Sequence, residues 1–342
     1  MRLAVTAPAR PTFDTRAAQD VADRAAELLG RQHDVVGTTD LVLDSPAPLD
    51  LSRVDAVVVL QASFADSSIT QSLLGDTRLP VLLWGIPEPR TGGRLKLNSL
   101  CGINLGAYAL ARAGRPYSWA YVHPDDSQAE ELVGAALART PSHSHGIPVD
   151  PDLETGRALA DGLADTTVGR VGLPPTGFDP CEAEPELIGA LSVAFDDRSL
   201  DSLFERAAVA TPTPVKGLTG VEDLDPEGVD RSARLHAGLQ TLAEEGGWDA
   251  LATRCWPECF TEFGAAACSP QSWLADAGIP AACEADIPGT LSALVLDRAA
   301  GRRAFVADRV DGAEDGTMAL WHCGYAPMSR AGEEPRATVH PN

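Results

Sequence analysis

Lysine is almost absent from this chain of 342 residues, which has only Lys96 and Lys216 among its 27 basic residues. Aspartate and glutamate together number 49, so the formal net charge is −22. Nucleic acids and anionic lipid surfaces are bound by basic faces, and the sequence offers none. We therefore expect no nucleic-acid partner. Excess carboxylate with few lysines fits either a high-GC genome or a salt-adapted, halophilic cytosol.

Long apolar runs are also missing. The longest one, around residues 56–60, is far shorter than the ~18 residues that cross a bilayer, so we expect no membrane span. The first residues lead directly into a strand-like stretch without the apolar core of a signal peptide. Seven cysteines are an odd number, which favours reduced thiols over a disulfide framework. These observations together predict a cytoplasmic protein.

Short apolar segments alternate with amphipathic ones through the first third of the chain. Residues 54–60 (VDAVVVL) and 80–84 (PVLLW) are typical of strands buried on both faces, and 15–29 and 99–113 of helices. This alternation predicts an α/β fold with a doubly wound parallel sheet. Ligands of such sheets bind beyond the carboxyl ends of the strands.

The remaining pattern suggests further α/β structure. A strand at 167–172 followed by helices at 200–207 and 231–245 predicts a second unit. We expect domains at residues 1–125, 126–285 and 286–342. The glycines of 91–101 (TGGRLKLNSLC) match neither the Walker nor the GxGxxG pattern, which argues against a nucleotide site. His143 and His145 form an H-x-H pair in a probable loop, a weak metal candidate.

Polar groups that follow apolar stretches are the best candidates for chemistry. Glu258 follows residues 250–255, Asp286 follows 280–283 and His322 follows 318–321. If these stretches are strands, the three side chains can converge at one sheet edge. Carboxylate oxygens with one imidazole suit Mn²⁺ or Mg²⁺. The simpler interpretation is a solvated rim, because the whole chain is rich in acids.

Cysteines offer an alternative metal site. Five of the seven fall between Cys255 and Cys323, and Cys255 and Cys259 are four residues apart. Structural zinc sites usually combine two close pairs, and here no second pair follows. Buried cysteine also packs simply as a small hydrophobic residue.

Four blocks stand out in the second half of the sequence: CWPE at 255–258, ACEAD-I-x-G at 282–289, GRRAFVAD at 301–308 and WHCG at 321–324. They resemble the L-fucose isomerase and L-arabinose isomerase superfamily. QASFAD, LLWGIPEP and GGRLKLNSLCG extend the resemblance into the N-terminal half. The resemblance implies two consecutive flavodoxin-like units followed by a short third region.

The resemblance also implies an activity. Members isomerise aldoses to ketoses with a divalent metal, usually Mn²⁺, while two carboxylates carry a proton between C1 and C2 through an enediol. Asp286 matches a ligand carboxylate of the family. Glu258 is the expected second carboxylate, with Glu262 as a competitor, and His322 matches a histidine. Four further residues are implied to lie near the sugar or a subunit contact: Trp84, Glu88, Arg94 and Asn98.

Longer members of the superfamily continue into a C-terminal β-barrel that supplies a metal-binding histidine. Here only residues 325–342 follow the WHCG block, and His340 lies among them. Despite this departure, the resemblance implies a homo-oligomeric, metal-dependent ketol isomerase acting on a small sugar. The alternative is a non-catalytic sugar-binding or regulatory protein of the same fold.

Overall fold

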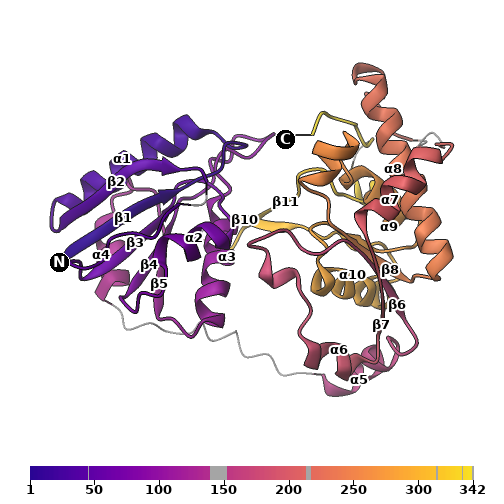
Figure 1. Cartoon of the computed structure of the whole chain (residues 1–342), viewed down its shortest axis with the longest axis horizontal. Coiled ribbons are helices and arrows are strands. Elements are labelled where there is room, and N and C mark those ends of the chain that lie inside the picture. The colour runs from indigo at the N-terminus through magenta and orange to yellow at the C-terminus, as the bar shows by residue number, and fades with distance from the viewer. Residues whose placement is uncertain (45, 139–151, 213–216, 313–314, 333, 341–342) are drawn as a thin grey trace. The chain divides into compact units, whose positions relative to one another are not determined.

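The computed structural model describes residues 1–342 except 45, 139–151, 213–216, 313–314, 333 and 341–342. The chain folds into two compact units (Figure 1). Unit 1 consists of Met1–Pro148 and Asp308–Trp321, and unit 2 of Val149–Ala307 and His322–Pro341. Residues 286–342 thus contribute to both units. The domain boundaries expected near residues 125 and 285 stay a prediction.

Unit 1 is built on a five-stranded sheet in the order β2-β1-β3-β4-β5. All neighbouring strands are parallel. This is the flavodoxin-like order, in which the chain reverses direction along the sheet beside the first strand. The strands are β1 (Arg2–Pro8), β2 (Asp34–Val42), β3 (Ala56–Gln61), β4 (Val81–Gly85) and β5 (Tyr117–Tyr121).

Side chains alternate across this sheet and form two cores. Val58 and Leu82 face the core shared with α1 (Thr15–Gly30) and α4 (Ala129–Ala138). Val57, Val59 and Leu83 face the opposite core, to which α2 (Ser67–Leu74) and α3 (Ser99–Arg112) contribute Leu74, Ile103 and Leu110. Figure 1 shows these helices around the sheet. Because both faces are covered, β3 and β4 are fully buried, which explains their continuous apolar sequences.

A short hairpin from late in the chain completes unit 1. β10 (Asp308–Gly312) and β11 (Met318–Trp321) pair antiparallel. The buried Asp311 on β10 accepts hydrogen bonds from Tyr121 Oη at 2.7 Å and from Arg90 Nε. Burial and the neighbouring Asp311 carboxylate raise the pKa of Tyr121 well above its usual range. The tyrosine therefore stays protonated and donates.

Unit 2 repeats the same winding with four parallel strands in the order β7-β6-β8-β9. They are β6 (Thr167–Val171), β7 (Ala194–Arg198), β8 (Ala250–Thr253) and β9 (Ala281–Ala282). The α/β class and the flavodoxin-like winding predicted from sequence and resemblance are therefore confirmed.

Helices cover both faces of this second sheet. One face packs against α7 (Leu200–Val209), α8 (Pro226–Gly246) and α9 (Cys268–Ala277), and the other against α10 (Ile287–Ala300). Two shorter helices, α5 (Leu153–Asp161) and α6 (Pro185–Leu191), precede β7. No helix in the described part of the chain is long and apolar enough to cross a membrane.

Gly169 on β6 shows why one strand position needs a residue without a side chain. A Cβ at this position would lie 2.1 Å from the indole ring of Trp248. Trp248 therefore packs directly on the strand, and its Nε1 donates to Asp196 on β7 at 3.0 Å.

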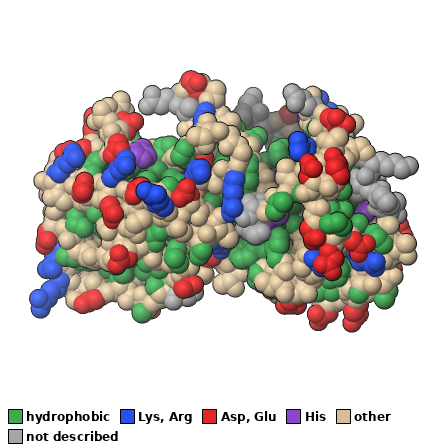
Figure 2. All heavy atoms as spheres, turned by 90° about the horizontal axis from the view of Figure 1, so that it is seen from above, with side chains coloured by type: hydrophobic (Ala, Val, Ile, Leu, Met, Phe, Trp, Pro, Cys, Tyr) green, Lys and Arg blue, Asp and Glu red, His purple; other side chains and the backbone are tan. Residues whose placement is uncertain are grey.

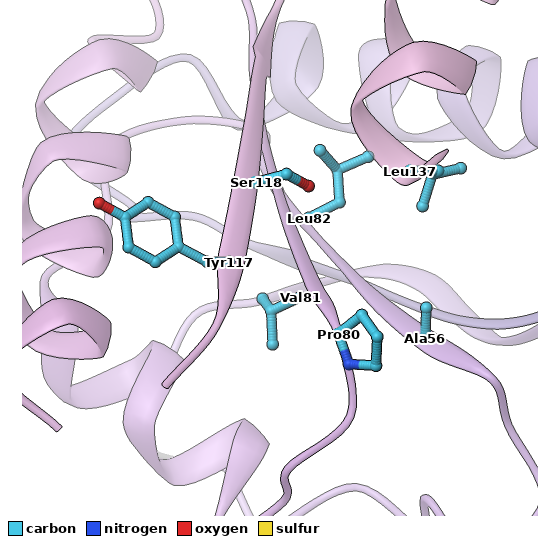
Figure 3. A pocket seen from close by; sticks show the side chains of 7 residues that line it. All are labelled: Ala56, Pro80, Val81, Leu82, Tyr117, Ser118 and Leu137. Atoms are coloured by element: carbon cyan, nitrogen blue, oxygen red, sulfur yellow. The ribbon is translucent and has the colours of Figure 1, made fainter. Parts of the chain in front are cut away.

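Two hollows lie at the amino ends of the strands. The smaller, of about 10 Å³, opens beside the first residues of β3, β4 and β5, where Figure 3 shows Ala56, Val81 and Tyr117. The larger, of about 380 Å³, is lined by Asp249 and Pro280, which precede β8 and β9. Ligands of doubly wound sheets bind at the opposite ends of the strands. We therefore do not place the candidate site in either hollow.

Candidate functional site

Glu258 and Asp286 follow neighbouring strands of unit 2. β8 and β9 pair in parallel, with Leu251 opposite Ala281 and Ala252 opposite Ala282. Because parallel strands end at the same edge of a sheet, the segments carrying the two carboxylates both begin at its carboxyl edge. The strands predicted before these residues are confirmed, although β9 is only two residues long.

Arg254 organises the first of these segments. Its Nε donates to Glu258 Oε2 at 2.6 Å, and its Nη1 donates to the carbonyls of Leu173 and Pro174, both at 3.2 Å. Partial burial tends to raise the pKa of Glu258, but the hydrogen bond and positive charge of Arg254 bring it below its ordinary value. Glu258 is therefore ionised at neutral pH and can accept a proton. Glu262, its competitor, is exposed on the π-helical turn Cys259–Phe263.

Asp286 is fixed at the amino end of α10. Its Oδ1 accepts a hydrogen bond from Gly289 N at 2.9 Å, which makes it the N-cap of the helix. A Cβ on Gly289 would lie 2.2 Å from Asp286 Oδ2, so glycine is required there for the carboxylate to keep this position.

The two residues before Asp286 have strained backbones. Glu284 and Ala285 both have φ of 54°, in the left-handed region that residues with a side chain rarely adopt. Such residues cost about 1–3 kcal/mol each and cluster at functional sites. The amide of Ala285 donates to the Thr253 carbonyl at 3.0 Å, which ties this strained turn to the end of β8. The turn therefore fixes the position of Asp286 relative to the carboxyl end of β8.

His322 follows a strand, as predicted, but that strand does not belong to the same sheet. β11 pairs only with β10 among the described strands, so the expectation that His322 follows a strand of the sheet carrying Glu258 and Asp286 is wrong. An apolar run does not reveal which strand it will pair with. His322 Nδ1 accepts from Tyr325 N at 3.3 Å, which places the proton of the neutral ring on Nε2.

The donor types of these residues fit a hard divalent ion, with two carboxylates and one imidazole. Their ligand atoms are not gathered in the structure, however. Within the described residues, the His, Cys, Asp and Glu side chains with three ligand atoms all within 4.8 Å of one another are Cys268, Cys323 and His340. Binding of a metal by Nδ1 of His322 would also require this ring to release Tyr325. The metal roles of Glu258, Asp286 and His322 stay predictions.

Trp84 and Glu88 already have protein partners in unit 1. Trp84 is fully buried at the end of β4, and its Nε1 donates to the Val122 carbonyl at 2.9 Å. Glu88 is buried and accepts hydrogen bonds from the backbone amides of Lys96, Leu97 and Asn98 at 2.5, 3.0 and 2.8 Å. Glu88 thus holds the loop that leads into α3.

Asn98 and Arg94 belong to the same loop. Asn98 precedes α3 with φ of 50°, and its Oδ1 is buried without a hydrogen-bond partner in the part of the chain that the structure describes. Arg94 is exposed and donates to the Thr12 carbonyl. Among the four residues expected near the sugar, Asn98 is therefore the one with a buried side-chain oxygen that accepts no hydrogen bond from the described residues. The predicted sugar contacts of all four stay predictions.

Three further points concern the sequence-based expectations. Arg254 was missed, although its spacing of four residues from Glu258 is a recognisable signal for an ion pair. His143 and His145 lie outside the described residues. Asp and Glu side chains are scattered over the face seen in Figure 2, so acidity alone does not mark the site.

Comparison with known proteins places this architecture in a family. The family model described as "Fucose/sulfoquinovose isomerase, N-terminal domain" matches residues 21–137. The chain is also 32% identical, over 98% of its length, to a curated sulfoquinovose isomerase, and it belongs to the fucose/sulfoquinovose isomerase family, a family of sugar isomerases.

Two relatives illustrate the extent of the similarity. Sulfoquinovose isomerase from Alkalicoccus urumqiensis is 32% identical over 354 aligned positions, which cover 98% of this chain and 75% of that protein. Sulfoquinovose isomerase from Priestia megaterium is 29% identical, covering 97% of this chain and 75% of the relative. The superfamily resemblance noted in the sequence is confirmed.

Proposed function

We propose that this protein is a metal-dependent aldose–ketose isomerase that acts on sulfoquinovose or a closely similar sulfonated sugar. One observation carries the proposal. Glu258 and Asp286 follow the neighbouring strands β8 and β9, in a chain 32% identical to a sulfoquinovose isomerase. The expected homo-oligomer and cytoplasmic location are part of this proposal.

The proposed reaction moves a proton between two adjacent carbons. Glu258, which Arg254 keeps ionised, takes the C2 proton of the open-chain aldose while the C1 oxygen gains a proton, so that an enediol forms. Glu258 then returns its proton to C1, and Asp286 carries the hydroxyl proton from the C2 oxygen to the C1 oxygen, which gives the ketose with no net gain or loss of protons. Glu258, Asp286 and His322 are the residues that would hold a divalent ion such as Mn²⁺, which when bound would supply Lewis acidity to polarise the carbonyl and stabilise negative charge.

A coupled assay for ketose formation tests this function. Purified protein with added Mn²⁺ is offered sulfoquinovose, pentoses and 6-deoxyhexoses, alongside Asp286→Asn and the control Asp201→Asn. Asp201 is an exposed carboxylate in the first turn of α7, in the same unit. We expect turnover of sulfoquinovose by wild type and control, and a loss of about 10²–10⁴-fold in Asp286→Asn. Wild type that turns over no sugar and cannot be distinguished from Asp286→Asn would contradict the proposal.

Metal content separates this enzyme from a non-catalytic sugar-binding protein. The enzyme is expected to hold Mn²⁺ that is lost on changing Asp286, whereas a binding protein is expected to bind sugar without it. Manganese is measured by mass spectrometry of the metal after gel filtration, with Glu205→Gln on the exposed side of α7 as a second charge-matched control.

A further inference from the structure

Three side chains that are distant in the sequence meet in unit 2, and none of them belongs to a residue proposed for the isomerase reaction. Cys268 is the first residue of α9, Cys323 lies in the WHCG block and His340 lies near the end of the chain. Cys268 Sγ is 3.8 Å from Cys323 Sγ and 3.6 Å from His340 Nε2. All three ligand atoms lie within 4.8 Å of one another.

These separations match those of a tetrahedral zinc site. Zinc binds thiolate sulfur at ~2.3 Å and imidazole nitrogen at ~2.1 Å. At the tetrahedral angle, these bond lengths place two sulfurs ~3.8 Å apart, and a sulfur and a nitrogen ~3.6 Å apart. The observed distances from Cys268 agree with both values, so the ligands need little movement to enclose an ion.

The surrounding chain favours this arrangement. A Cβ on Gly324 would lie 3.0 Å from Cys268 Cβ and 3.4 Å from His340 Cδ2, so the absence of a side chain lets the WHCG turn pack closely against both. The C-terminal segment is held independently, because Ala337 N donates to the Thr219 carbonyl at 2.8 Å. His340 also packs on Phe260, with ring centroids 4.8 Å apart.

Cys268 stands in the first turn of α9, where the amino end of a helix favours a thiolate. Its Sγ also accepts a hydrogen bond from Cys283 Sγ at 3.9 Å. Cys268 is buried, whereas Cys323 and His340 are partly exposed, so an ion can enter from the solvent side.

We propose that Cys268, Cys323 and His340 bind a zinc ion that ties the C-terminal segment to α9 and to the WHCG turn. Two thiolates and an imidazole favour zinc over manganese, which prefers oxygen ligands. The site uses none of the residues proposed for the isomerase reaction, although Cys323 Sγ lies 3.7 Å from Nδ1 of His322. It also differs from the Cys255 and Cys259 pair considered from sequence. Those two sulfurs instead contact Glu284 Oε1 at 3.9 Å and the Arg254 carbonyl at 3.5 Å.

The test uses the full chain purified under reducing conditions and needs no enzyme activity. Metal-free protein is titrated with Zn²⁺ alone, and with Co²⁺ as a spectroscopic probe. We expect about one equivalent to bind, with the thiolate-to-cobalt absorption of a tetrahedral site. Cys268→Ser and His340→Gln are each expected to weaken binding by more than about tenfold. Cys181→Ser, in the same unit but outside the trio, is expected to bind like wild type.

His340→Gln keeps the test decisive if Cys268→Ser fails to fold, because His340 is partly exposed and lies outside the core. Failure to bind zinc, or binding that both substitutions leave unchanged, overturns the proposal. So does a Cys268–Cys323 disulfide found by mass spectrometry of the protein isolated without reductant. Since the readout is metal binding, these outcomes are independent of whether the sugar isomerase reaction is observed.

Discussion

Asp286 gives the sharpest test of the site because its structural and chemical roles can be separated by substitution. Its Oδ1 caps α10 through the amide of Gly289. Asparagine is as good an N-cap as aspartate, whereas alanine at such a position costs about 0.5–2 kcal/mol. We therefore expect Asp286→Asn to keep the free energy of unfolding of wild type. We expect Asp286→Ala to lose about 1 kcal/mol, or about 2–4 °C in Tm for a unit of this size.

The two Asp286 variants, which are expected to differ in stability, are expected to be alike in activity. Both substitutions remove the ionisable group, so both are expected to lower kcat for ketose formation by about 10²–10⁴-fold. Stability is measured by urea unfolding and activity by the coupled assay, with Asp201→Asn as the matched control. If Asp286→Asn loses activity only in proportion to lost folded protein, or keeps activity within a few-fold of wild type, the carboxylate has no chemical role and our reasoning is refuted.

Three further predictions concern the surrounding fold. Glu88→Gln places a side-chain NH₂ group against one or more of the backbone N–H groups that now donate to the Glu88 carboxylate. We therefore expect the free energy of unfolding to fall by about 1–3 kcal/mol and hydrogen exchange at Leu97 and Asn98 to become faster. Unchanged exchange at these two amides would contradict the conclusion that Glu88 holds this loop. Burial lowers the pKa of His236, so the unfolded chain binds its proton more readily and stability should fall as pH drops below about 6.5. The difference from His236→Gln in urea unfolding should change with pH by at most about 1.4 kcal/mol per unit, and a pH-independent difference would exclude this contribution. Gly169→Ala should cost about 1–3 kcal/mol because its methyl group overlaps Trp248, and Gly169→Ala/Trp248→Leu should cost less than the sum of the two single changes if that overlap is the cause.

The strands that could be predicted are those buried on both faces, because complete burial requires a continuous run of apolar residues. Residues 56–61 and 81–85 are buried on both faces, so their apolar runs identified them as strands. The edge strand β7 was missed because its sequence, AFDDR, is mostly charged. The charged side chains of β7 form ion pairs. For example, Nε of Arg170 on β6 donates to Asp197 Oδ1 at 2.8 Å. Such pairing depends on the neighbouring strand, which local sequence does not contain.

The candidate site shows the same difference between local signals, which can be read from the sequence, and contacts between distant segments, which cannot. Glu258 and Asp286 were selected as candidates because each comes a few residues after a short apolar strand, which is a local signal, and their roles stay predictions. The pairing of β11 with β10 depends on distant segments, and so the sheet to which His322 was assigned was wrong. Cys268, Cys323 and His340 were missed as a group because 55 and 72 residues separate the latter two from Cys268. Metal motifs are recognised by short spacings, and this arrangement has none.

The hairpin Asp308–Trp321 has a consequence for how the chain matures on the ribosome. It belongs to unit 1, yet the whole of Val149–Ala307, in unit 2, is synthesised before it. Tyr121 and Asp311, which form a buried hydrogen bond, are 190 residues apart, and translation at about 5–20 residues per second separates their emergence by about 10–40 seconds. During this interval, α3 lacks the strand whose Arg309 carbonyl contacts Cys101. Unit 1, most of which emerges first, is thus completed only when translation has reached the end of the hairpin.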